Sequence, residues 1–491
     1  MGISLLVIGA IVIAGATLAG NGNPVVAVAP IALLVCAYVV CILPVRYTVF
    51  SLIFLSLALD VSEEGPWSSP LAPLGMLLAH NLNKTIPISA LVIPGIGLAM
   101  LALIALLWHR SFTGSEIDSR GRTPAPAALY GGLATSFISI FVLVALGKMR
   151  GGDMQMAKVQ VQNFVLMLTM AYLVAMSFRS VQDYRVYAKI IVVAAVSRAF
   201  YVMYVIHHLK SVNPGAEIPV AATHGDSLLF AAAVVLLIVR FMEKPSRRAM
   251  AWCVTLIPIM LIGMQLNNRR LVWVQVAAGL LTFALLSRRS QMKRLAAHGV
   301  LLMLPLIVAY IAIGWNSSSK IFAPIKTYRS VTDGKVDPST LYRDLENFNL
   351  LQTMRVHPLT GQGFGQPFVE TVVLPDISRI FREYKYFPHN AVLGLWAFTG
   401  PLGFSGLMMA IVVAMFFAIR SYRMATSNDE RTAAVLVIAM FVIYFAHCWG
   451  DMGFSERRQI FLVGPALAIA GQLAYATGAY RARTQNARLA R

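Results

Sequence analysis

Residues 389–419 read HNAVLGLWAFTGPLGFSGLMMAIVVAMFFAI and contain no Asp, Glu, Lys or Arg. About 20 mainly apolar residues are enough for one helix to cross the hydrocarbon core of a bilayer. Similar apolar runs recur along the chain, and the segments between them hold most of the charges. A helix satisfies its own backbone hydrogen bonds, which lipid cannot do for it. The sequence therefore predicts an all-α fold, a polytopic membrane helix bundle.

The composition of the 491-residue chain agrees with that fold. Hydrophobic residues make up 58% of it, charged residues 13%, and the mean hydropathy is +0.70. A typical soluble domain is about 25% charged. These values exclude a disordered chain, a coiled coil and a disulfide-stapled secreted module. The four cysteines all fall in apolar runs, so we interpret them as small buried hydrophobes and expect no metal site.

We expect about 14 transmembrane helices, within a range of 12–14 because the third and tenth apolar runs are short. The first run has no preceding Lys or Arg, so it is interpreted as a retained span and not as a signal peptide. The expected spans lie near 3–20, 24–43, 45–60, 86–108, 129–147, 157–178, 185–206, 225–242, 249–266, 271–286, 298–314, 389–419, 432–449 and 458–478.

The basic residues predict the orientation of these spans. With a cytoplasmic N-terminus, strict alternation places most of the net charge of +20 on the inner side, as the positive-inside bias requires. Both termini are then cytoplasmic. Because Lys and Arg are dispersed between apolar runs and do not line one face, no nucleic-acid partner is expected.

The polar segment 315–388 divides the chain into three parts. Residues 1–314 hold the first eleven spans, residues 315–388 form one large extracytoplasmic loop, and residues 389–491 hold the last three spans and a cytoplasmic tail. Turn signals at Asp333-Gly334 and Asp337-Pro338 precede a predicted amphipathic helix from Ser339 to about Arg355. We therefore expect this periplasmic loop to be partly helical.

Several arginines are candidates for binding an anion at the outer membrane face. Arg269 and Arg270 separate two short apolar runs, and a guanidinium offers phosphate a planar fork of donors. The alternative is an interfacial anchor that reaches lipid headgroups. Arg198 lies inside a predicted span, where it binds an anionic ligand or pairs with an acid such as Asp226 or Asp153.

Two further polar groups lie at predicted span ends. Arg457 and Arg458 open the last span after acidic residues, so they contact substrate or form a local salt-bridge cluster. His224 and Asp226 start the eighth span, where such a pair is more typical of a helix cap than of a catalyst.

A stretch rich in Gly, Pro and His leads into the quoted apolar run. Pro358 ends a helix, and Gly361, Gly363 and Gly365 predict a tight turn of bare backbone. His389 starts the run itself. A neutral imidazole near several guanidinium groups suits a general base, although a lone His at a helix start is more often a cap or an interface residue.

The order of these motifs resembles the O-antigen ligase and Wzy-type polysaccharide polymerase superfamily of bacterial membrane proteins. The motifs are residues 268–271 (NRRL), Arg343, residues 357–365 (HPLTGQGFG), 389–390 (HN) and 400–403 (GPLG). The resemblance is strong over roughly residues 260–420, and before that only span count and loop placement agree.

The resemblance implies a metal-independent membrane glycosyltransferase of the GT-C kind, without a cofactor, in the bacterial inner membrane and with its active site facing the periplasm. Its donor would be an oligosaccharide on undecaprenyl diphosphate. His389 would deprotonate the acceptor hydroxyl, and Arg269 or Arg270 would hold the diphosphate. Further candidates for the substrate site are Arg343, Arg198, Arg458, Arg457 and Asn390.

Four functions remain open, and the first is favoured because the spans are numerous. A polymerase would join lipid-linked repeat units into O-antigen, capsule or exopolysaccharide, with a chain-length regulator or a flippase as candidate partners. A ligase would move the finished glycan to lipid A core or another acceptor. A lipid-linked oligosaccharide flippase would need more intramembrane charges than the sequence offers. The fourth is a non-catalytic assembly scaffold.

Overall fold

The computed structural model describes residues 35, 38–59, 72–81, 93–215, 221–287, 290–317, 319–322, 325, 329, 338–379 and 381–480. These residues form helices and contain no strand, which confirms the predicted all-α fold. The elements are α3 (Val45–Ala58), α4 (Ala72–Ala79), α5 (Gly95–Phe112), α6 (Ala127–Met149), α7 (Met154–Ser177), α8 (Val181–Val212), α9 (His224–Glu243), α10 (Arg247–Asn267), α11 (Leu271–Leu286), α12 (Gln291–Trp315), the 3-10 helix η2 (Lys320–Phe322), α14 (Pro338–Val356), α15 (Ala391–Met424), α16 (Asn428–Gly450) and α17 (Gln459–Ala476).

Ten helices of the described segments are long and apolar enough to cross a membrane, and α3 and α11 are shorter apolar helices. Each of these twelve corresponds to one predicted span. The predicted span 3–20, and most of 24–43, lie outside the described residues. The predicted amphipathic helix of the long loop is present as α14.

Serine side chains fix where several helices begin. Ser246 Oγ accepts the backbone N–H of Ala249 at 3.1 Å, and Ser427 Oγ accepts that of Glu430 at 3.2 Å. Such caps satisfy amide groups that the first turn of a helix leaves without an internal partner. Helices α10 and α16 each begin directly after the capping serine.

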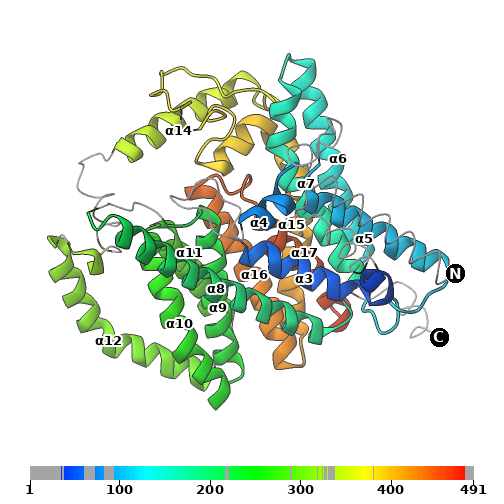
Figure 1. Ribbon diagram of the computed structural model, residues 1–491, viewed down its shortest axis with the longest axis horizontal. Helices are drawn as coiled ribbons and strands as arrows, with labels where there is room; N and C mark the ends of the chain where they lie inside the picture. The colour runs from blue at the N-terminus through cyan, green and yellow to red at the C-terminus, as the bar shows by residue number, and fades with distance from the viewer. Residues whose placement is uncertain are drawn as a thin grey trace, which may run out of the picture.

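Helix α17 forms the centre of the bundle. It packs on α7, α15 and α16 and is almost entirely buried, whereas α12 buries none of its apolar residues in the chain and lies at one edge (Figure 1). Gly464 allows α17 to approach α7 closely, because a Cβ there would lie 2.8 Å from the Met167 carbonyl oxygen. The exposed apolar face of α12 is the face expected to contact lipid.

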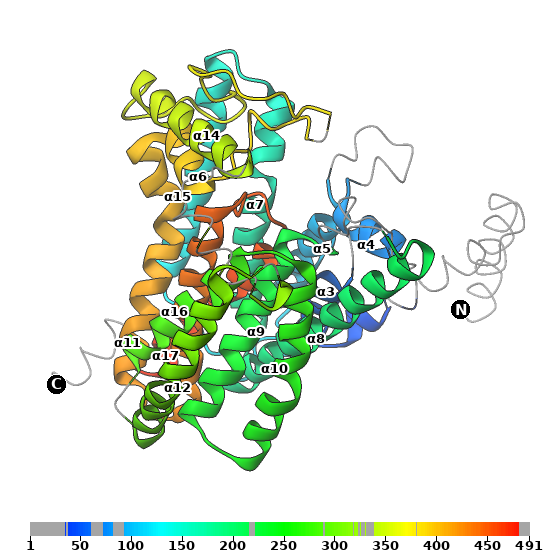
Figure 2. The same ribbon diagram turned by 90° about the vertical axis from the view of Figure 1, so that its left-hand side faces the viewer.

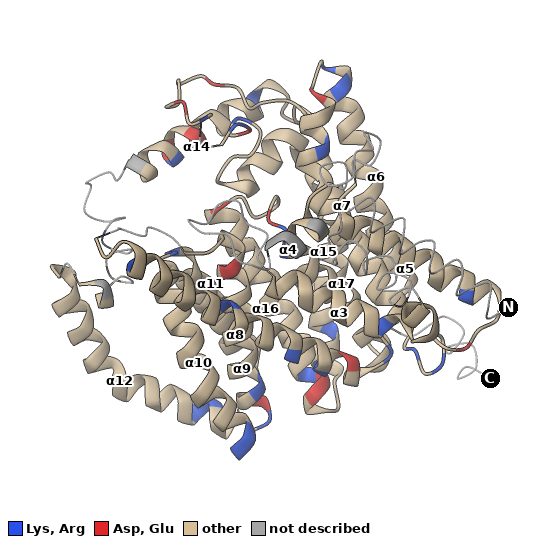
Figure 3. Cartoon of the chain, viewed as in Figure 1, with Lys and Arg blue, Asp and Glu red and all other residues tan. Residues whose placement is uncertain are grey.

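Helix α14 and the start of α15 lie beyond the end of the bundle at which α16 joins α17 (Figure 2). At the opposite end, Lys and Arg gather at the turn from α9 to α10, while α14 carries charges of both signs (Figure 3). The two ends of the bundle therefore differ in charge.

Helix α15 is broken at Gly400, where φ is 59° and ψ is 176°. Pro401 follows and has no N–H to donate to Ala397 four residues earlier. The backbone N–H of Gln362 replaces it, at 3.1 Å from the Ala397 carbonyl oxygen. The backbone of Gly363 donates in the same way to Phe398, at 2.7 Å. The glycine-rich loop thus completes the hydrogen bonds of the broken helix.

Candidate functional site

His389 lies next to a buried carboxylate of the long loop. Glu346, in the middle of α14, accepts the backbone N–H of His389 at 2.8 Å, and both of its oxygens lie 3.3 Å from Nδ1. The Glu346 side chain is 1% exposed and that of His389 is 21% exposed. Since a carboxylate accepts and does not donate, Nδ1 carries the proton of the neutral ring. Nε2 is then left with a lone pair that can accept a proton.

Tyr342 packs against this pair. Its ring lies one turn before Glu346 on α14, at 5.6 Å from the His389 ring and edge-on to it. Burial raises the pKa of the Tyr342 hydroxyl, and the Glu346 carboxylate raises it further. The hydroxyl therefore stays protonated, and among the described residues it has no hydrogen-bond partner. The Tyr342 hydroxyl can therefore donate a hydrogen bond to a ligand next to the His389 ring.

Arg343 follows Tyr342 on α14 and is partly buried. Its Nε atom is inaccessible to solvent and has no hydrogen-bond partner within the described segments. Arg343, a substrate-site candidate from the sequence, therefore lies on the same helix as Tyr342 and Glu346.

A second polar group forms where α10 turns into α11. Asn268 adopts the left-handed conformation that ends α10, with φ of 53°, and Arg269 follows it. Nη1 of Arg269 lies 2.5 Å from Nε2 of His224, and Nδ1 of His224 contacts the Asp451 carboxylate. Arginine can only donate, so His224 accepts at Nε2 and donates from Nδ1.

Asp451 fixes this second group from the end of α16. Burial would raise the pKa of its carboxyl, but the hydrogen bond from His224 outweighs burial and holds the pKa below its usual range. Asp451, His224 and Arg269 thus form a continuous chain from α16 through α9 to the turn before α11. Arg270 comes next, is exposed, and begins α11.

Two amides of α7 bind chain segments next to the two polar groups. Gln160 donates to the Tyr386 carbonyl at 2.9 Å, three residues before His389, and Asn163 donates to the Ser455 carbonyl. Residues three apart on a helix lie on the same face, with Cβ atoms about 5–6 Å apart. The segment that leads into His389 and the turn between α16 and α17 therefore lie side by side on α7.

Residues 255–408 match the family model described as O-Antigen ligase. No curated protein matches the chain. The resemblance predicted from the motifs is confirmed for this segment, which holds Arg269, Arg270, Arg343 and His389. An O-antigen ligase segment supports a ligase or polymerase of lipid-linked glycans, and so a glycosyltransferase-like membrane enzyme.

Asn390 has a structural role in the O-antigen ligase segment. Its side-chain oxygen accepts the backbone N–H of Leu393 at 3.1 Å, so it is the N-cap of α15. The residue is buried, and its carbonyl oxygen is occupied by the helix. The cap fixes the position of His389, its neighbour, at the start of the helix.

Arg198 and Arg458 lie outside the O-antigen ligase segment and share one carboxylate. Arg198 binds Asp226 through Nε at 2.7 Å and Nη2 at 3.0 Å, and Nη2 of Arg458 lies 3.0 Å from the same residue. All three side chains are buried. Of the alternatives that the sequence left open for Arg198, the structure shows the pair with Asp226.

Asp226 also caps α9, because its carboxylate accepts the backbone N–H of Thr223 at 3.0 Å, as the position at a span start suggested. Arg457 lines a small cavity with Leu55 and Ile96. Arg198, Asp226 and Arg458 therefore join α8, α9 and α17.

Glu346 is the residue that the sequence interpretation missed. It lies four residues after Tyr342 and three after Arg343, the spacing that places side chains on one face of a helix. A polar face on the predicted amphipathic helix was visible in the sequence. Which residue of that face meets His389, 43 positions later, depends on how α14 packs on α15.

Proposed function

We propose that the chain is a metal-independent glycosyltransferase of the bacterial cytoplasmic membrane that transfers a glycan from a polyprenyl diphosphate to an acceptor hydroxyl. The observation that carries the proposal is the pairing of His389 with Glu346 inside the O-antigen ligase segment. Arg269 and Arg270 are in the same segment. They belong to the end of the bundle at which α7 binds the residues just before His389.

His389 acts as the general base. Its Nε2 takes the proton of the acceptor hydroxyl while the hydroxyl oxygen attacks the anomeric carbon of the donor sugar. Glu346 keeps the Nδ1 proton in place and stabilises the imidazolium that forms, as the carboxylate of a catalytic triad does. The glycosidic C–O bond forms, and the bond from the anomeric carbon to the diphosphate oxygen breaks.

The leaving diphosphate develops negative charge that fixed cations stabilise. Guanidinium groups bind phosphate oxygens through two parallel N–H bonds, and a site near the membrane has a low dielectric that strengthens this attraction. Arg270 is exposed and directly follows Arg269, whose position His224 and Asp451 fix. Arg270 therefore contacts the diphosphate, with Arg269 beside it and Arg343 contributing from α14.

The site faces the periplasm, and both termini are cytoplasmic. The basic turn between α9 and α10 lies at the other end of the bundle from α14, and basic turns favour the cytoplasmic side. Lipid-linked donors delivered to the outer leaflet would then meet His389 at the membrane surface.

The favoured reaction is polymerisation of undecaprenyl-diphosphate-linked repeat units, and the ligase reaction is the second candidate. The two share the base and the leaving group and differ only in the acceptor. The number of apolar spans favours the polymerase, and the description of the matched family model favours the ligase.

The test is incubation of purified protein with undecaprenyl-diphosphate oligosaccharide, with and without lipid A core, and with and without EDTA. A ladder of lengthening products from the donor alone identifies a polymerase. Transfer that requires lipid A core identifies a ligase. Loss of activity in EDTA would overturn the metal-independent mechanism, and no transfer by folded protein in either mixture would overturn the proposed function.

A further inference from the structure

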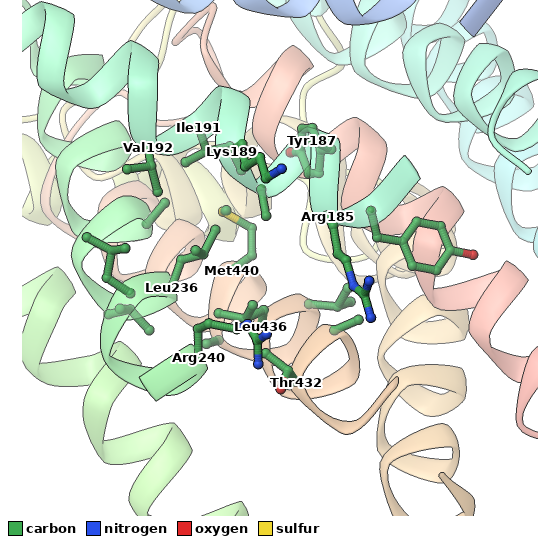
Figure 4. Close-up of a pocket in the computed structure, with 18 of the residues that line it drawn as sticks. Arg185, Tyr187, Lys189, Ile191, Val192, Leu236, Arg240, Thr432, Leu436 and Met440 are labelled. Carbon is green, nitrogen blue, oxygen red and sulfur yellow. The ribbon is translucent and has the colours of Figure 1, made fainter. Parts of the chain in front are cut away.

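A groove of about 410 Å³ opens at the end of the bundle opposite α14. Its walls come from α8, α9, the start of α10, α16 and α17. Figure 4 shows the cations Arg185, Lys189 and Arg240 around the same space as the apolar side chains Leu236, Leu436 and Met440. Pockets that bind small molecules have volumes of about 300–1,000 Å³. The groove is large enough for part of a lipid.

The inner part of the groove is apolar. Residues of α16 that recur every three or four positions, among them Leu436, Met440 and Ile443, face Val235 of α9 and Ile469 of α17. From Asp429 to Ile443 the lining runs about 21 Å along α16 at 1.5 Å per residue. One leaflet of a bilayer has a hydrocarbon thickness of about 15 Å. The lining along α16 is therefore longer than one leaflet is thick.

The mouth of the groove is strongly basic. Its lining includes the cations Arg185, Lys189, Arg240, Lys244 and Arg248 and the single carboxylate of Asp429. Asp429 contacts Arg185 and lies 3.7 Å from Arg240 and 3.8 Å from Lys244. One carboxylate cannot neutralise five cations, so the mouth keeps an excess of positive charge.

Individual groups at the mouth have unused binding capacity. Nη1 of Arg240 is inaccessible to solvent and has no hydrogen-bond partner in the part of the chain that is described. The Arg248 guanidinium lies 5.7 Å above the Trp252 ring, which holds it at the edge of the groove. The helices α8, α10 and α16 all begin here, and their dipoles add positive potential.

We propose that this groove binds one anionic phospholipid of the adjacent leaflet. The phosphate lies among Arg240, Lys244 and Arg248, and one acyl chain follows Leu236, Leu436 and Met440 into the bundle. Basic pockets between membrane helices are suited to anionic headgroups. This inference is independent of the proposed glycosyl transfer, because His389, Glu346 and Arg270 do not line the groove.

The test is lipid binding to the full chain purified in detergent, measured by native mass spectrometry during titration. The probes are phosphatidylglycerol and phosphatidylcholine with identical acyl chains. We expect phosphatidylglycerol to bind at least tenfold more tightly, with one molecule retained per protein. Equal affinity for the two lipids would overturn the proposal, because the basic mouth would then have no role.

Two pairs of variants separate the groove from its surroundings. Arg240→Gln with Arg248→Gln should weaken phosphatidylglycerol binding about thirtyfold, from about 1 kcal/mol per basic residue. Arg247→Gln with Arg294→Gln removes the same charge from exposed positions outside the groove and should leave binding unchanged. If both double variants lose phosphatidylglycerol affinity equally, the lipid binds to the basic surface in general and the proposed site is refuted.

The apolar part is tested with the charges kept. Ala188→Phe fills the groove from α8, and Val193→Phe places the same ring on the outer face of that helix, where the native side chain is 52% exposed. Only Ala188→Phe should abolish retention of phosphatidylglycerol. If both variants keep the lipid while remaining folded, the acyl chain does not enter the groove and the proposal is wrong.

Discussion

Gly363 lies against the backbone of Gly147 on α6, so closely that a Cβ at position 363 would come 2.3 Å from the Gly147 nitrogen. Its φ of 88° is also one that side chains disfavour. The glycine-rich loop is therefore fixed between α6 and the break in α15. His389 lies two residues before the first residue of α15, so the loop holds the helix that positions the candidate base.

Replacing Gly363 with Ala should destabilise the protein by about 2–5 kcal/mol, because it combines backbone strain with overpacking. Thermal unfolding in detergent measures the effect. Gly131→Ala, with open space around its Cβ position, is the control and should leave the unfolding temperature unchanged or higher. Equal unfolding temperatures for Gly363→Ala and the native protein would contradict the close contact.

His389→Ala should lower the rate of glycan transfer by about 10²–10⁴-fold, the usual contribution of a general base. The thermal unfolding temperature should fall only modestly, since the backbone N–H of residue 389 still donates to the buried Glu346 carboxylate. Product formation from a lipid-linked donor provides the readout. Normal product from the folded variant would remove His389 from the mechanism.

Glu346→Gln should lower kcat by at least about 100-fold with little change in KM, because the amide neither stabilises the imidazolium nor enforces the Nδ1–H tautomer. Glu346→Asp should restore part of the rate. Asp344→Asn, on the exposed side of α14, is the matched control and should behave as the native protein. A change in KM alone would argue that Glu346 positions substrate and not His389.

Arg270→Lys should reduce kcat/KM by about 10²–10³-fold, since an ammonium cannot make the two parallel bonds that a guanidinium makes to phosphate. Arg247→Lys, at the other end of α10, controls for a general effect of the substitution. Full activity of Arg270→Lys would identify it as a lipid anchor and leave Arg269 as the phosphate ligand.

Asp226→Asn should destabilise the fold by about 3–5 kcal/mol, because it removes the buried negative charge that the guanidinium groups of Arg198 and Arg458 share. Unfolding in detergent again measures the loss. An unchanged unfolding temperature would mean that water or lipid phosphate reaches these arginines, and would return both to the list of substrate-binding candidates.

Local features of the sequence determined the helices. Apolar length predicted each described span, and the amphipathic pattern predicted α14. These predictions succeed because lipid acts on contiguous residues: a run of about 20 apolar side chains crosses the bilayer whatever its neighbours are. The family motifs that contain Arg269, Arg270 and His389 were also recognised from contiguous residues.

Only the tertiary structure decided which side chains meet. Glu346 contacts His389 because α14 packs on α15, and Arg198 binds Asp226 because α8 lies beside α9. Ion pairs and hydrogen bonds act over a few ångströms between residues far apart in the chain. Their partners therefore depend on which helices are neighbours in space. The hydropathy of a helix does not specify which helices lie next to it.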